Sequence, residues 1–67
     1  MMRTKEEIEQ EIADVGESFR LWYVVDEGAG MRLYAEYRAL YWVLHPEIKS
    51  RLELIEQVNA ALGLAKG

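Results

Sequence analysis

The chain contains no cysteine, one histidine (His45) and one proline (Pro46) among its 67 residues. The lack of cysteine excludes disulfides and thiolate metal sites, and a single histidine cannot build a zinc site alone. A chain this short buries only about 60% of the surface that its unfolded form exposes, and small folds usually compensate with disulfides, a metal or oligomerisation. We therefore expect no metal or other cofactor, and we expect oligomerisation to complete the core.

Long apolar segments are also missing. The apolar run without a charged residue from Ala39 to Pro46 is far shorter than the roughly 20 residues that a membrane-spanning helix needs. The N-terminal sequence MMRTKEEIEQ lacks the apolar region of a signal peptide. We expect a soluble, cytoplasmic protein that makes no membrane contact.

Basic residues are outnumbered, eight against twelve acidic ones, so the net charge is −4. Residues 1–28 hold eight acids and three bases, a net charge of −5, while residues 29–67 hold four acids and five bases, a net charge of +1. Proteins that bind nucleic acid usually carry a basic surplus on one surface, because phosphate contacts supply most of their affinity. The sign of the charge therefore disfavours nucleic acid as a partner.

The residues that are present predict helices, beginning with a capping box at Thr4 to Glu7. Apolar residues then recur at spacings of four and three, which is the pattern of a helix that packs against another helix. They are Ile8, Ile12, Val15, Phe19 and Trp22. We predict a first helix over about residues 4–26, in which Gly16 permits the close approach of a neighbour.

One segment of this helix also fits a strand. Residues 19–25, FRLWYVV, are aromatic and β-branched, and their side chains alternate as those of a strand would. The alternative fold class is therefore α+β, with a short hairpin at about residues 19–37. The helical spacing that continues to Trp22 favours the helix.

Asp26 to Gly30 contains two glycines and predicts a break, followed by a second helix over about residues 31–44. Four of its residues form one apolar face: Leu33, Tyr37, Leu40 and Leu44. Four more form a second apolar strip on roughly the opposite face: Met31, Ala35, Ala39 and Trp42. A helix that is apolar nearly all round is usually buried, so we expect a second chain to cover part of it.

His45 and Pro46 mark the next boundary, because proline suits the first turn of a helix and disfavours the helical conformation in the residue before it. We predict a third helix over about residues 46–62; a continuous, kinked second and third helix stays open. Its inward residues are Ile48, Leu52, Ile55, Val58 and Leu62. Asn59 either fixes the register of an oligomer or stays solvated while Val58 takes the inward position.

Together these patterns predict a single domain over residues 1–67. Its fold class is all-α, a hairpin or bundle of two or three helices completed by oligomerisation. The opening Arg3 to Ile8, the glycine turn and the segment from Ala39 to Leu44 resemble small uncharacterised helical-hairpin proteins of prokaryotes and their viruses. The resemblance implies a helical hairpin over residues 4–44 and implies no known activity or site residues.

We predict no catalytic residues, because His45 has no nucleophile or acid at a telling spacing and the acidic residues of the first helix point away from its apolar face. Tyrosine and tryptophan suit interfaces, since they combine a large apolar area with a polar tip. The predicted interface residues are Trp22, Tyr34, Tyr37, Tyr41 and Trp42.

The predicted function is that of a non-enzymatic protein-interaction or regulatory module, which binds itself as a homodimer or higher oligomer and also binds another protein. Two alternatives stay open. One is a small DNA-binding regulator in which the second and third helices form a helix-turn-helix. The other is an acidic inhibitor of a nucleic-acid enzyme, carried by a mobile element.

Overall fold

A computed structural model describes residues 4–64 of the chain. It contains three α-helices, α1 (Lys5–Trp22), α2 (Glu27–Leu44) and α3 (Arg51–Ala61), and no strand within the described residues. The all-α prediction is confirmed. The alternative hairpin over residues 19–37 is wrong, because both of its proposed strands lie mainly in helices.

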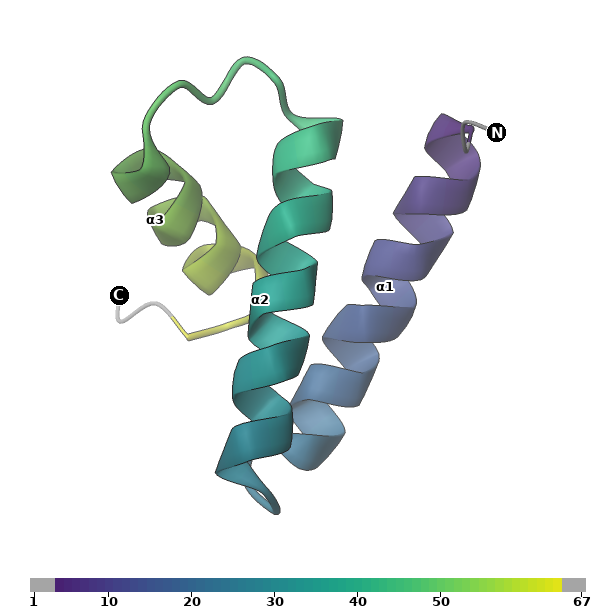
Figure 1. The fold of residues 1–67 in the computed structure, drawn as a ribbon, viewed down its shortest axis with the longest axis vertical. Coiled ribbons are helices and arrows are strands. Elements are labelled where there is room, and N and C mark those ends of the chain that lie inside the picture. Colours follow the sequence, from purple (N-terminus) through teal and green to yellow (C-terminus); the bar gives the residue numbers. More distant parts are fainter. Residues whose placement is uncertain (1–3, 65–67) are drawn as a thin grey trace.

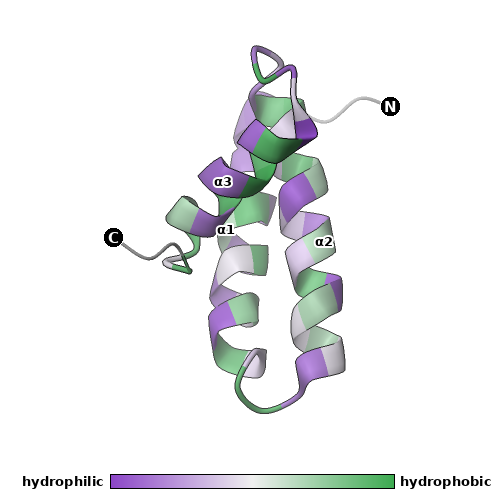
Figure 2. Ribbon diagram, turned by 90° about the vertical axis from the view of Figure 1, so that its left-hand side faces the viewer, coloured by the Kyte–Doolittle hydropathy of each residue, from purple (hydrophilic) through white to green (hydrophobic). Residues whose placement is uncertain are grey.

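Helices α1 and α2 run antiparallel as a hairpin, and α3 packs across α2 (Figure 1). The view from the side shows that α3 lies against the half of the hairpin that is distant from its turn (Figure 2). The turn of the hairpin, residues 23–26, and the segment that joins α2 to α3, residues 45–50, are therefore at opposite ends of α2.

The capping box at the start of α1 is confirmed. The Thr4 hydroxyl oxygen accepts a hydrogen bond from the Glu7 backbone N–H at 3.1 Å, and a Glu7 carboxylate oxygen accepts one from the Thr4 N–H at 2.9 Å. The helix ends at Trp22, not at residue 26 as predicted. It ends there because Asp26 caps a new helix: its carboxylate oxygen accepts a hydrogen bond from the Ala29 N–H at 3.2 Å.

The predicted break at Asp26 to Gly30 is therefore wrong in position, since α2 already begins at Glu27 and includes both glycines. Gly30 is buried, and a Cβ atom added to it would lie 3.1 Å from the Tyr23 Cα. Gly28, by contrast, would meet only a carboxylate oxygen of Asp26, at 3.4 Å. Gly30 is thus needed for the close approach of the hairpin turn to α2, and not for a break in the helix.

The replacement Gly30→Ala is expected to lower the free energy of unfolding by about 1–3 kcal/mol, because the added methyl group forces the backbone at Tyr23 to move. The matched control is Gly28→Ala, which is expected to raise it by up to about 1 kcal/mol through the greater helix propensity of alanine. Thermal unfolding at one fixed protein concentration measures both changes. Equal shifts for the two variants would contradict the role assigned to Gly30.

The third helix begins later than predicted, at Arg51 instead of Pro46. Ser50 provides the N-cap, since its hydroxyl oxygen accepts a hydrogen bond from the Glu53 N–H at 3.2 Å, and serine is a preferred capping residue. Residues 45–50 form a separate connection, so α2 and α3 are not continuous. This shift overturns the prediction that Leu52 points inward: Leu52 is 72% exposed, and Leu54 is buried instead.

The core lies where the three helices and the 45–50 connection meet. Its buried members are Phe19, Ile48, Leu54, Val58 and Leu62. Val15 of α1 is also buried. Gly16 brings α1 close to α2, because a Cβ atom at this position would lie 2.9 Å from Cε2 of the Tyr37 ring. The predicted role of Gly16 in close helix packing is confirmed.

Candidate interaction surface

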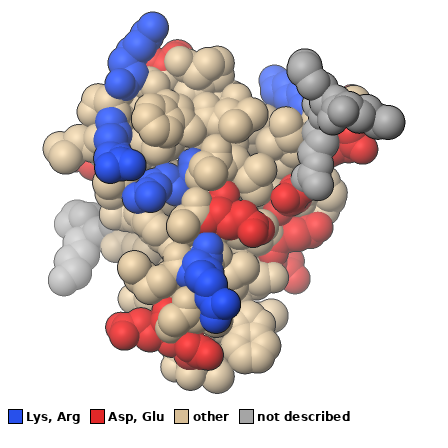
Figure 3. Space-filling model, in the orientation of Figure 1, with Lys and Arg blue, Asp and Glu red and all other residues tan. Residues whose placement is uncertain are grey.

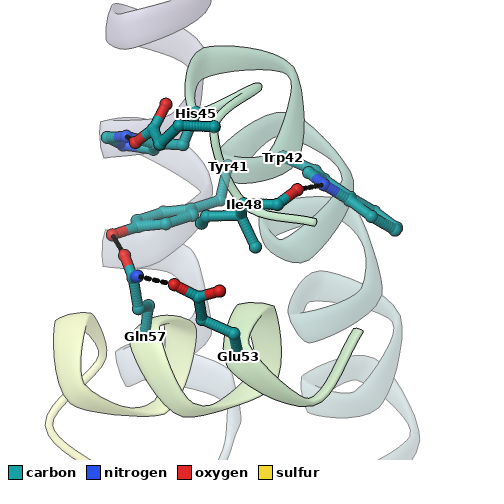
Figure 4. Close-up of polar contacts among 7 residues, drawn as sticks. Tyr41, Trp42, His45, Ile48, Glu53 and Gln57 are labelled. Atoms are coloured by element: carbon teal, nitrogen blue, oxygen red, sulfur yellow. Dashed lines mark hydrogen bonds and ion pairs between the residues drawn. The ribbon is translucent and has the colours of Figure 1, made fainter. Parts of the chain in front are cut away.

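Three of the predicted interface residues, Tyr34, Tyr37 and Tyr41, lie together on the face of α2 that packs against the core. The Tyr34 hydroxyl donates a hydrogen bond to Oδ1 of Asn59 at 2.6 Å. The Tyr41 hydroxyl donates one to Oε1 of Gln57 at 3.1 Å (Figure 4). Helix α3 of the same chain therefore covers much of the tyrosine surface that we expected a second chain to cover.

Asn59 is half-buried beside Val58, whose side chain is completely buried. Val58 thus takes the inward position, as in the predicted alternative in which Asn59 stays solvated. Asn59 is not simply solvated, however, since its hydrogen bond to Tyr34 joins α3 to α2 across the edge of the core. This bond orients α3 within one chain, and a role of Asn59 in the register of an oligomer stays a prediction.

Trp42 lies on a different side of α2 from the face with the three tyrosines, and it is 39% exposed. Its indole N–H donates a hydrogen bond to the Ile48 carbonyl at 2.9 Å, which fastens the 45–50 connection to α2 (Figure 4). His45 caps the end of α2, with its ring 4.3 Å from that of Tyr41 and its Nδ1 3.2 Å from a carboxylate oxygen of Glu47. His45 is therefore a residue of the helix junction.

Burial is the main cause that raises the pKa of Tyr37, and the neighbouring Tyr41 raises it further, while Arg20 acts in the opposite direction. A tyrosine whose pKa is raised above its usual value of about 10 keeps its proton at neutral pH. The Tyr37 hydroxyl is therefore a neutral group, and it offers neither a charged ligand nor a nucleophile.

Apart from Leu52 of α3, the large apolar side chains that stay exposed fall into two groups. The first, which we call the hairpin tip, consists of Leu21, Trp22, Tyr23, Val24 and Val25. The second consists of Met31, Trp42 and Val43, and together with the small, exposed Ala35 and Ala39 we call it the outer face of α2. Of the predicted interface residues, Trp22 belongs to the hairpin tip and Trp42 belongs to the outer face of α2.

The hairpin tip is the part of this surface that the sequence analysis missed. Val24 is 82% exposed and Val25 71% exposed, although valine is usually a core residue. A shallow pocket of about 420 Å³ adjoins the tip, between the end of α1 and the start of α2. It is lined by Ser18, Trp22, Asp26, Ala29, Arg32 and Leu33. The unbroken apolar run from residue 21 to residue 25 was the available signal.

Charged side chains are unevenly distributed over the surface. Acidic groups follow α1, and basic groups gather near the 45–50 connection and the start of α3 (Figure 3). Among residues 4–64 no cluster of three or more histidine, aspartate or glutamate side chains could hold a metal ion. None of the described helices is both long enough and apolar enough to span a membrane.

No protein-family model, no curated protein and no solved structure matches this chain. The resemblance to small helical-hairpin proteins therefore stays a prediction. The function has to be inferred from the exposed apolar surface and the charges beside it.

Proposed function

We propose that the protein is a non-enzymatic interaction module that binds a second copy of itself through its exposed apolar surface. The observation that carries the proposal is the outer face of α2, where Met31 and Val43 are each 62% exposed although both belong to the helix that contacts both of the others. Exposed apolar patches on small proteins commonly mark interaction sites. The part of the hairpin tip that a second copy leaves uncovered is available to a further protein partner.

Light scattering of the purified chain, over concentrations from below to well above the micromolar range, tests the proposal. We expect a molar mass that rises from that of the 7.8 kDa chain to twice this value as the concentration increases. A molar mass that stays at 7.8 kDa at the highest concentrations would contradict self-association.

A further inference from the structure

Neither of the other two helices covers the outer face of α2, and the 45–50 connection contacts it at Trp42. Met31, Ala35, Ala39 and Trp42 follow one another at spacings of four, four and three, so they lie on one side of the helix. Helices α1 and α3 occupy the other side, where Leu33, Tyr34 and Tyr37 contact the core. The outer face therefore extends along nearly the whole of α2, with small alanines at its centre and large side chains at its ends.

Each long edge of this face carries one acid and one base. Arg32 and Glu36 are one turn apart on the edge beside α1, and Glu27 and Arg38 are three turns apart on the edge beside α3. Within residues 4–64, Arg32, Glu36 and Glu27 form no ion pair, and Arg38 lies over the Tyr34 ring at 6.0 Å. In the orientation of Figure 1, the surface of the molecule is largely uncharged and carries charged groups of both signs (Figure 3).

We propose that two copies of α2 pair antiparallel through their outer faces, about a two-fold axis close to residues 33 and 34. The inference rests on the proposed self-association and adds its geometry. In an antiparallel pair each edge of a helix meets the same edge of its partner, running in the opposite direction. Arg32 then faces Glu36 of the second copy, and Glu27 faces Arg38 of the second copy, each pair occurring twice.

The same register accounts for the sizes of the apolar residues. Ala35 lies beside Met31 of the second copy, and small residues near the axis allow the two helices to approach closely. The start of each α2, preceded by the exposed Val24 and Val25, then lies near the end of the other, where Trp42 and Val43 are exposed. Antiparallel pairing thus covers parts of both exposed apolar groups in one contact.

A parallel pair would use the charges differently. Opposite edges would meet at the same level, so Arg32 would face Glu27 and Glu36 would face Arg38 of the second copy. The two arrangements therefore differ in the partner of every charge, although each of them pairs acids with bases in the natural chain. Exchanging the charges at positions 32 and 36 therefore distinguishes the antiparallel arrangement from the parallel one.

The experiment measures the dimer dissociation constant by sedimentation equilibrium for Arg32→Glu, for Glu36→Arg and for the double variant that carries both changes. Each single change places like charges opposite one another at two places in the antiparallel dimer, and we expect it to weaken association about tenfold or more. The double variant restores opposite charges at both places, so its dissociation constant should return to within about threefold of the natural value. Glu9→Arg, on the exposed surface of α1, is the matched control and should change association little.

The opposite pattern would overturn the inference. In a parallel dimer the double variant would place acid against acid and base against base, and would bind more weakly than either single variant. If the natural chain dimerises but all three variants dimerise equally well, the outer face of α2 is not the contact, while the proposed function stands. If the natural chain is monomeric at every concentration, the proposed function itself fails.

Discussion

Replacing Phe19 by alanine is expected to leave much of the chain unfolded at 25 °C. Phe19 is only 3% exposed and belongs to the core cluster with Leu54 and Val58 of α3. Its ring also stacks on Tyr23 at 4.9 Å and lies 6.2 Å from Tyr34 of α2. Phe19 therefore joins α1 to both of the other helices.

The expected loss is about 3–5 kcal/mol, the usual cost of removing a buried phenylalanine side chain. At roughly 0.05–0.15 kcal/mol per residue, a chain of 67 residues has a total stability of only about 3–10 kcal/mol. The loss is thus comparable with the whole stability. Urea titration followed by circular dichroism at 222 nm measures it, at a fixed protein concentration because dimerisation adds to the apparent stability.

Leu21→Ala is the matched control for Phe19→Ala. Leu21 lies two residues further along α1 and is 66% exposed, so its loss is expected to change the free energy of unfolding by no more than about 0.5 kcal/mol. Similar urea midpoints for the two variants would show that Phe19 does not hold α1 against α3 in the way that its contacts indicate.

The second large effect is expected for Ala35→Glu, which should abolish dimerisation in the micromolar range while the monomer stays folded. Ala35 is exposed at the centre of the outer face, so a glutamate there is solvated in the monomer. It lies one turn from both Arg32 and Arg38, and opposite charges at that spacing support a helix. In the dimer the same carboxylate would be buried against Met31 of the second copy, and burying an uncompensated charge is costly.

We expect the dissociation constant of Ala35→Glu to rise at least 100-fold, which corresponds to about 2.7 kcal/mol. Ala60→Glu is the control, because Ala60 is exposed on α3 and outside both apolar groups. Trp42→Glu is less informative, since it also removes the hydrogen bond from the indole N–H to the Ile48 carbonyl. If Ala35→Glu dimerises as well as the natural chain, the hairpin tip becomes the leading candidate for the contact.

Local chemistry made parts of this fold predictable. The capping box at Thr4 could be read directly, because the atoms that satisfy the first backbone N–H groups lie within three residues of each other. The buried face of α1 was predictable as far as Phe19, because residues three or four positions apart lie on the same face of a helix. Trp22 continues the spacing but is 50% exposed, because α1 ends there and α3 does not extend to the tip.

The boundaries of the other two helices were less predictable. The sequence pattern of Asp26 to Gly30 fits two structures. In one the glycines break a helix, and in the other Asp26 caps the start of a helix in which a glycine allows a close contact. The position of Tyr23 against Gly30 decides between them, and that contact depends on how the turn folds back. At the third helix, Ser50 and Pro46 are both acceptable starting signals, and the burial of Ile48 in the core keeps residues 46–50 out of the helix.

The sequence by itself determined that the chain forms helices, that one of them is apolar on two opposite faces, and that no disulfide could stabilise them. Only the tertiary structure decided which of the two faces is buried. The 45–50 connection turns α3 onto the tyrosine face, where Asn59 and Gln57 accept hydrogen bonds from Tyr34 and Tyr41. The opposite face offers alanines and no comparable polar partners, so α3 packs better on the tyrosine face and the outer face of α2 stays exposed.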